Sequence, residues 1–79
     1  MEEYLDFWQS LENTLLESVD SVTKTKEEKV DLLEGKTAED LIDYLEINDA
    51  KNIEKLKGTK EAYVQAAQFG LLSSLRQAS

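Results

Sequence analysis

Short polar clusters that typically begin helices interrupt an apolar repeat of helical period along this chain, and the chain contains no proline. Gly35 and Gly58 each precede such a cluster, which starts at Thr37 after the first glycine and at Thr59 after the second. Because glycine tolerates the left-handed conformation that ends many helices, we expect Gly35 to close one helix in that conformation and Gly58 to close another. The pattern therefore predicts short helices between longer ones.

The two ends of the chain show the clearest helical period. In the first segment, apolar residues recur at spacings of three and four through Tyr4, Trp8, Leu11, Leu15, Val19 and Val22. The last segment, from about Lys60 to Gln77, has its apolar content at Tyr63, Val64, Ala67, Leu71, Leu72 and Leu75. Both segments predict long helices with one apolar face.

The middle of the chain begins with a capping box. Thr25 is followed three residues later by Glu28, so the two side chains can each accept a hydrogen bond from the other residue's backbone amide. We expect a helix from there to about Glu34. Residues 25–34 and 37–46 share a Thr-x-Glu-acid-x-Val/Ile-Asp-x-Leu-Glu pattern. We interpret this repeat as two helices with the same capping and burial needs; a duplicated binding unit is the alternative.

The next two helices are shorter or less distinct. Thr37 should cap a helix that runs through Glu46 and ends at Asn48, and Asp49 should cap a fourth helix that Gly58 closes. The connections near Gly35 and Asn48 are too short to join long antiparallel neighbours. We therefore predict a single all-α domain over residues 1–79: a compact bundle of about five helices, orthogonal in its middle, in which long N- and C-terminal helices bracket three short ones.

Composition excludes several kinds of site. The chain has no cysteine and no histidine, which removes disulfides, thiolate–zinc sites and the commonest general base. Neither a glycine-rich phosphate loop nor a calcium-binding loop is present, and the serines have no histidine to activate them. A chain of 79 residues also has little room for the apolar cleft that a catalytic pair of carboxylates needs. We expect no enzymatic activity, no cofactor and no metal.

Charge favours a protein partner. The net charge is −8, and residues 1–23 contain no Lys or Arg. An acidic surface repels phosphates and anionic lipids, so we expect a partner with a basic surface and neither direct nucleic-acid binding nor membrane binding. A helix-turn-helix is disfavoured for the same reason, since only the fourth helix carries suitable side chains. The N-terminus lacks a cationic signal region and no apolar stretch is long enough to span a membrane, which predicts a cytoplasmic location.

The first helix contains the first candidate binding residues. Tyr4, Trp8 and Leu11 have the spacing with which an amphipathic helix enters a hydrophobic groove. Because Trp8 is the only tryptophan of a small core, we expect it to hold the first helix against the fifth. Tyr4 and the off-stripe Phe7 are the better candidates for an interface.

The last helix contains the second candidate. Ala62, Ala66, Gly70 and Ser74 are spaced by four and form a row of small side chains along which another helix can approach closely. A glycine within a helix costs about 1 kcal/mol relative to alanine, so close packing at Gly70 would compensate. Contact with the first helix of the same chain is one interpretation, and contact between two copies is the other.

The function that these features favour is non-catalytic. We expect a small acidic protein-binding or regulatory protein that acts through helix-mediated contacts, with homodimer formation left open. One alternative is a mimic of nucleic acid that inhibits a basic nucleic-acid-binding protein, and the other is a self-assembling structural subunit. The candidate partner-binding residues are Glu2, Glu3, Tyr4, Asp6, Phe7, Ala66 and Gly70.

Overall fold

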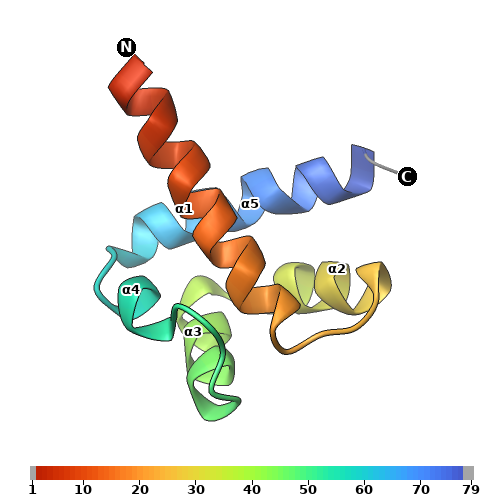
Figure 1. The fold of residues 1–79 in the computed structure, drawn as a ribbon. Coiled ribbons are helices and arrows are strands. Elements are labelled where there is room, and N and C mark those ends of the chain that lie inside the picture. Colours follow the sequence, from red (N-terminus) through yellow and green to blue (C-terminus); the bar gives the residue numbers. More distant parts are fainter. Residues whose placement is uncertain (1, 78–79) are drawn as a thin grey trace.

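The fold is all-α, as expected, with two long helices bracketing three short ones. The computed structural model describes residues 2–77, without the side chains of residues 2–5. Within this range the chain forms no strand and five helices, α1 (Glu2–Asp20), α2 (Lys26–Gly35), α3 (Ala38–Ile47), α4 (Ile53–Lys57) and α5 (Glu61–Gln77) (Figure 1).

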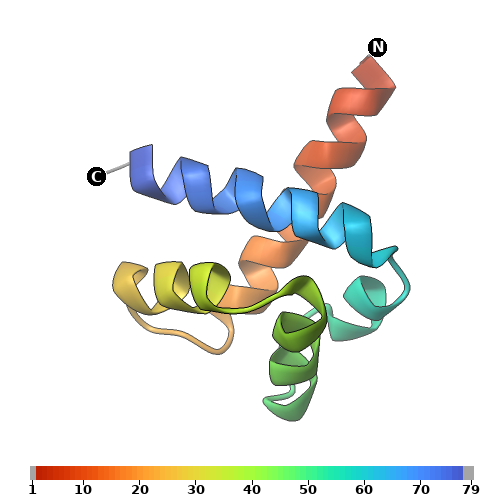
Figure 2. The same ribbon diagram turned by 180° about the vertical axis from the view of Figure 1, so that it is seen from behind.

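The two long helices cross each other, and the short helices pack beneath the crossing. α5 contacts α1, α2 and α3, while α4 contacts α3 and α1. The N-terminal part of α1 continues past α5 and projects from the body, which both face views show (Figures 1 and 2). The molecule measures 34 × 30 × 18 Å along its principal axes. Because packed helices lie about 8–10 Å apart, the short dimension corresponds to two layers of helices and a thin core.

Two threonines begin the repeated helices as predicted. Thr25 and Glu28 form a complete capping box, in which the Glu28 amide donates to the Thr25 hydroxyl over 3.1 Å and the Thr25 amide donates to the Glu28 carboxylate over 3.1 Å. The Thr37 hydroxyl accepts from the Asp40 amide at the start of α3. Leu33 and Leu45, which the repeat aligns, are both buried. These contacts support the interpretation of two helices with the same capping and burial needs.

The predicted helix ends are partly wrong. Gly35 and Gly58 end α2 and α4 as predicted, but neither is left-handed: Gly35 is the last residue of α2, and Gly58 follows α4 with a right-handed φ of −82°. The positive φ values in the described chain occur instead at Asp49 (54°) and Asn52 (67°). Asp49 therefore does not cap α4, since Asn52 occupies the cap position. The short polar side chains of Asn and Asp tolerate this region better than other non-glycine residues.

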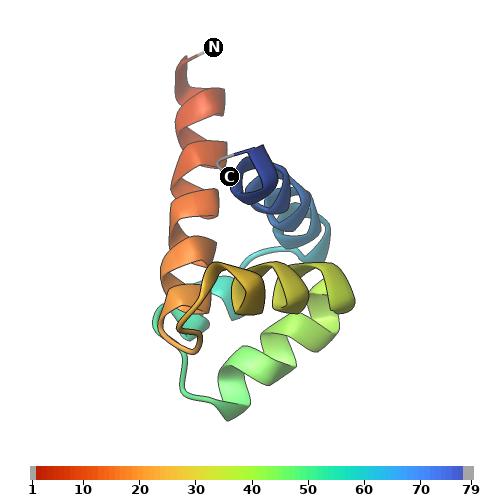
Figure 3. The ribbon, with the colours of Figure 1, turned by 90° about the vertical axis from the view of Figure 1, so that its right-hand side faces the viewer.

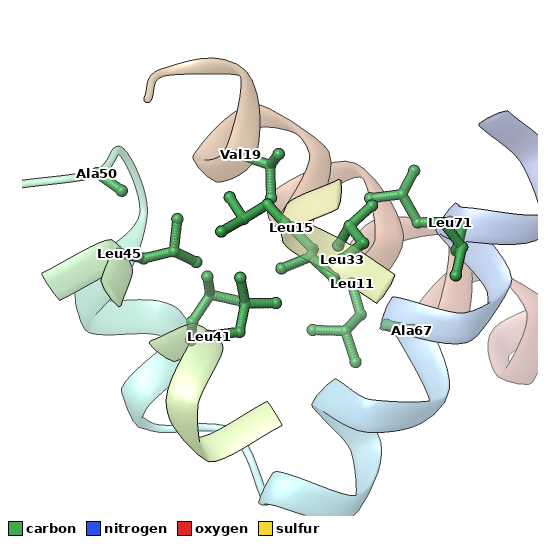
Figure 4. Packing of buried hydrophobic residues seen from close by; sticks show 12 residues of the cluster. Leu11, Leu15, Val19, Leu33, Leu41, Leu45, Ala50, Ala67 and Leu71 are labelled. Carbon is green, nitrogen blue, oxygen red and sulfur yellow. The ribbon is translucent and has the colours of Figure 1, made fainter. Parts of the chain in front are cut away.

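The core lies where apolar side chains from all five helices meet (Figure 4). Leucine side chains dominate it, and those with at most 1% of their surface exposed are Leu15, Leu33, Leu41, Leu45 and Leu56. α1 adds Leu11 and Val19, and α5 adds Ala67 and Leu71. Residues from both chain ends therefore complete one cluster.

One polar side chain joins α5 to the turn between α2 and α3. Gln68 is 2% exposed, and its Nε2 donates to the carbonyl of Leu33 over 2.6 Å and to that of Lys36 over 2.7 Å. The Leu33 carbonyl belongs to the last turn of α2, where carbonyls have no partner within the helix. Gln68 therefore satisfies a helix end for which the sequence predicted a left-handed Gly35.

Candidate protein-binding surface

Three aromatic rings meet where α1 crosses α5. The centroids of Phe7 and Trp8 lie 5.1 Å apart, and the ring of Tyr63 lies 5.7 Å from Phe7 and 5.8 Å from Trp8. All three pairs are edge-to-face, which is a favoured arrangement of aromatic quadrupoles. We call Phe7, Trp8 and Tyr63 the aromatic cluster.

One ring of the aromatic cluster packs against the core, and the other two are partly exposed to solvent. Trp8 is half-buried and packs against the core between α1 and α5, as expected for the only tryptophan. Phe7 is 44% exposed and Tyr63 is 41% exposed. The prediction that Phe7 is partly exposed is confirmed, whereas the side chain of Tyr4 lies outside the described residues.

Acidic groups lie on the α1 side of the cluster. Asp6 is exposed one residue before Phe7, and α1 contains no Lys or Arg over its whole length. The side chains of Glu2 and Glu3 lie outside the described part of the chain. On the other side, the Lys60 ammonium is 5.8 Å from the centre of the Tyr63 ring. The aromatic cluster therefore has the carboxylate of Asp6 on its α1 side, which we call the acidic border, and the ammonium group of Lys60 near the start of α5.

The structure separates the two small residues that the sequence placed in one interface. Gly70 lies against α1, because a Cβ at this position would meet the carboxylate of Glu12. Ala66, one turn earlier, is exposed. The contact within the chain is therefore the one present at Gly70, and only Ala66 remains available to another molecule.

The outward face of α5 was missed at the sequence level. Phe69 is 59% exposed on this face, and Ala62, Ala66 and Ser73 are exposed beside it. The signal was present, since the chain has no charged residue from Ala62 to Leu75 although 33% of all residues are charged. A run without charge on an exposed helix is informative because most solvated helix faces carry charged side chains.

The described surface has open hollows and no cluster of metal-binding side chains. No group of three or more Asp, Glu, His or Cys residues in this part of the chain is arranged to hold a metal ion. The hollows on the surface are open, and the one beside Phe69, of about 280 Å³, lies between α5 and the turn from Glu34 to Ala38. None of the described helices combines the length and apolar character needed to cross a bilayer.

Two titrating groups are perturbed, and both serve local structure. Hydrogen bonds from the Lys24 and Thr25 amides lower the pKa of Glu28 at the start of α2. A 2.5 Å hydrogen bond to Glu46, together with the charge of that carboxylate, raises the pKa of Lys57. Both groups are exposed, and neither belongs to the aromatic cluster.

Comparisons of the chain with protein-family models, curated proteins and solved structures found no match.

Proposed function

We propose that this chain is a non-catalytic regulatory protein that binds a basic protein partner through the aromatic cluster and the adjoining acidic side of α1. The observation that carries the proposal is the half-exposed state of Phe7 and Tyr63 around a tryptophan anchored in the core. Aromatic side chains of this kind supply large contact areas at protein interfaces, where a few such residues carry most of the binding energy.

The acidic border supports the choice of partner. Asp6 adjoins Phe7, and no basic residue precedes Lys24 in the chain. Charges at the rim of an interface accelerate association with a partner of opposite charge and disfavour partners of the same charge. An amphipathic helix with an apolar face and flanking Lys or Arg residues fits both the rings and the border.

The test compares two exposed phenylalanines. Wild type, Phe7→Ala and Phe69→Ala are immobilised and used to capture proteins from the source cells, and each captured protein is then titrated while Trp8 fluorescence is followed. We expect Phe7→Ala to weaken binding by roughly 5- to 30-fold, corresponding to about 1–2 kcal/mol, and Phe69→Ala to leave it unchanged. Equal binding by wild type and Phe7→Ala would contradict the proposal.

Salt provides the second measurement. Binding across the acidic border should weaken as ionic strength rises, because exposed charges further apart than about 8–10 Å are screened at physiological salt. The variant Asp6→Asn should bind more slowly and depend less on salt, whereas Glu54→Gln on α4 is the matched control with the same loss of charge. A complex that is indifferent to salt and to Asp6→Asn would exclude the acidic border from the interface.

Nucleic-acid mimicry is the second candidate, and it is favoured by the absence of Lys and Arg from α1, in which Asp20 alone among the described acids forms an ion pair, with Lys29 of α2. A mimic would compete with duplex DNA or RNA for the captured partner, because both ligands would occupy the same basic surface. A partner that binds this chain and nucleic acid at the same time would exclude mimicry and leave the protein-binding proposal intact.

A further inference from the structure

The aromatic cluster is bordered by two charges of opposite sign. Asp6 is exposed on α1 immediately before Phe7, and Lys60 is exposed immediately before α5. The Lys60 ammonium is 5.8 Å from the centre of the Tyr63 ring, which in turn is 5.7 Å from the centre of the Phe7 ring. The ammonium is therefore at most 11.5 Å from the Phe7 ring, the sum of these two distances. One bound segment can contact the rings and both charges.

Neither charge is neutralised by an ion pair within the described chain. The ion pairs among residues 6–77 join Lys29 to Asp20, Lys57 to Glu46 and Arg76 to Glu34. Glu61 follows Lys60 directly in the sequence, yet it is not among these pairs, and the Lys60 ammonium contacts the Tyr63 ring instead. Both charges are therefore available to a second molecule at the aromatic cluster.

Within the described chain, α1 and the start of α5 border the aromatic cluster. Figure 3 looks along α5 from its C-terminal end and shows the N-terminal half of α1 rising beside this helix, with α2 and α3 below both. The same part of α1 extends past α5 in Figure 1. A segment that covers the rings therefore meets the carboxylate of Asp6 on the α1 side and the ammonium of Lys60 at the start of α5.

We propose that the partner segment is a helix of mixed charge. Its Lys or Arg lies against Asp6, its Asp or Glu lies against Lys60, and apolar residues between them cover the rings. This inference rests on the proposed function and adds the order of charges along the bound helix. Because a helix rises 5.4 Å per turn, the acid that reaches Lys60 and the apolar side chain that contacts Phe7 should lie within about two turns of each other.

A uniformly basic helix fits this site less well. The net charge of −8 attracts such a helix from a distance, but interactions between exposed charges are screened beyond about 8–10 Å at physiological salt. At contact distance, a Lys or Arg beside the Lys60 ammonium repels it, whereas an Asp or Glu pairs with it. The net charge therefore favours rapid encounter with basic partners, and Lys60 discriminates among them.

Two synthetic helices test the order of charges. Both peptides are about 14 residues long, with a stripe of leucines along one face and arginines at one end. The other end has glutamates in the first peptide and lysines in the second. Each peptide is titrated into wild type, Lys60→Glu and Lys55→Glu while Trp8 fluorescence is followed. Lys55, which is exposed on α4, is the matched control because its substitution changes the net charge equally.

The two peptides should respond to Lys60→Glu in opposite directions. Relative to Lys55→Glu, this variant should bind the glutamate peptide roughly 3- to 10-fold more weakly and the lysine peptide more tightly by a similar factor. The two variants have the same net charge, so long-range attraction cancels in the comparison. Tighter binding of the lysine peptide is also a gain that loss of folding cannot produce. Equal effects of the two substitutions on both peptides would overturn the proposed order of charges.

The variant Phe7→Ala distinguishes failure of this inference from failure of the proposed function. Binding that depends on Phe7 but is equal in Lys60→Glu and Lys55→Glu would overturn the order of charges and leave the aromatic cluster as the binding site. Peptides that bind wild type and Phe7→Ala equally, or that do not bind wild type at concentrations up to about 1 mM, would overturn both proposals. Circular dichroism of each variant confirms that the helices are retained.

Discussion

The strongest test of the fold concerns Gln68, whose amide joins α5 to the end of α2. Two substitutions of Gln68 separate the contribution of its volume to stability from that of its Nε2 donor. Gln68→Met keeps the approximate volume and removes all hydrogen bonding, whereas Gln68→Glu keeps the shape and replaces the donor Nε2 with an oxygen. Because both neighbours of Nε2, the carbonyls of Leu33 and Lys36, are acceptors, the two variants should differ in a defined direction.

The methionine variant should be moderately destabilised. The Leu33 carbonyl is left buried without a donor at a cost of about 1–3 kcal/mol, and the part-buried carbonyl of Lys36 loses about 0.5–1.5 kcal/mol. Removal of Oε1 returns about 1–3 kcal/mol, because this atom is buried without a hydrogen-bond partner among the described residues. The net loss is about 1 kcal/mol, or roughly 4–8 °C in melting temperature for a domain of this size.

The glutamate variant should be much less stable near neutral pH. A buried carboxylate facing two carbonyl oxygens costs about 3–5 kcal/mol, which is a large part of the roughly 4–12 kcal/mol expected for a chain of this length. Burial should raise the pKa of the new carboxyl group in the folded state. The free energy of unfolding of the Gln68→Glu variant is therefore greatest below the unfolded-state pKa of about 4.3, and it falls as pH rises towards the folded-state pKa of this carboxyl group.

Urea unfolding monitored by Trp8 fluorescence and circular dichroism measures all three proteins between about pH 4 and pH 7. Low protein concentration is needed near the acid end because the isoelectric point is about 4.4. Gln68→Glu should approach Gln68→Met at the acid end and fall several kcal/mol below it at about pH 7. Equal stability of the two variants at neutral pH would refute the assigned donor role of Nε2.

Three further changes test local features. Thr25→Ala should reduce the free energy of unfolding by about 1 kcal/mol in urea titrations, because the α2 cap is lost; an unchanged midpoint would contradict the capping box. The bonds from the Lys24 and Thr25 amides lower the pKa of Glu28, so their stabilisation is present above the unfolded pKa and is lost as pH falls through the folded value. Unfolding measured against pH should thus show a shallower acid decline for Glu28→Gln than for wild type. Gly70→Ala should leave thermal stability unchanged or raise it by up to about 1 kcal/mol, because only the flexible Glu12 carboxylate must move; a clear loss would show that Glu12 is held in place.

Helix starts were predictable because their signals are local. The hydroxyl of Thr25 and the carboxylate of Glu28 lie three residues apart and act on each other's backbone, so no distant part of the chain is needed to recognise them. Thr37 likewise caps the start of α3 through a residue three positions later. Asn48 ends α3 as expected, which is also a local signal. Local capping chemistry accounts for the successful prediction of where α2 and α3 begin.

Helix ends were harder to predict because their partners are distant. Gly35 did not need a left-handed conformation, since Gln68 from α5 supplies a donor to the carbonyl of Leu33. The loop before α4 shows a similar effect. The side-chain amide of Asn52 donates to the Glu17 carboxylate on α1 over 2.8 Å, and the hydroxyl of Ser21 accepts from the backbone of the same loop. Such contacts depend on the packing of α1 and cannot be read from spacing.

The candidate surface was predictable only in part. The exposure of Phe7 followed from its place off the apolar stripe, but its contact with Tyr63 depends on how α1 crosses α5. The spacing of Ala66 and Gly70 predicted one contact for both residues, but the crossing places only Gly70 beside Glu12 and leaves Ala66 exposed. Crossing angles depend on side chains from both helices, so the sequence of one helix does not determine them.

The pairing of α1 with α5 also has a consequence for synthesis on the ribosome. Leu11 and Leu15 are synthesised well before the face of α5 that covers them, which includes Ala67 and Leu71. Contacts between distant parts of a chain form only after a large loss of chain entropy. The nascent chain must therefore carry an uncovered leucine stripe until α5 has been synthesised, and the acids along α1 would keep that stripe soluble during the interval.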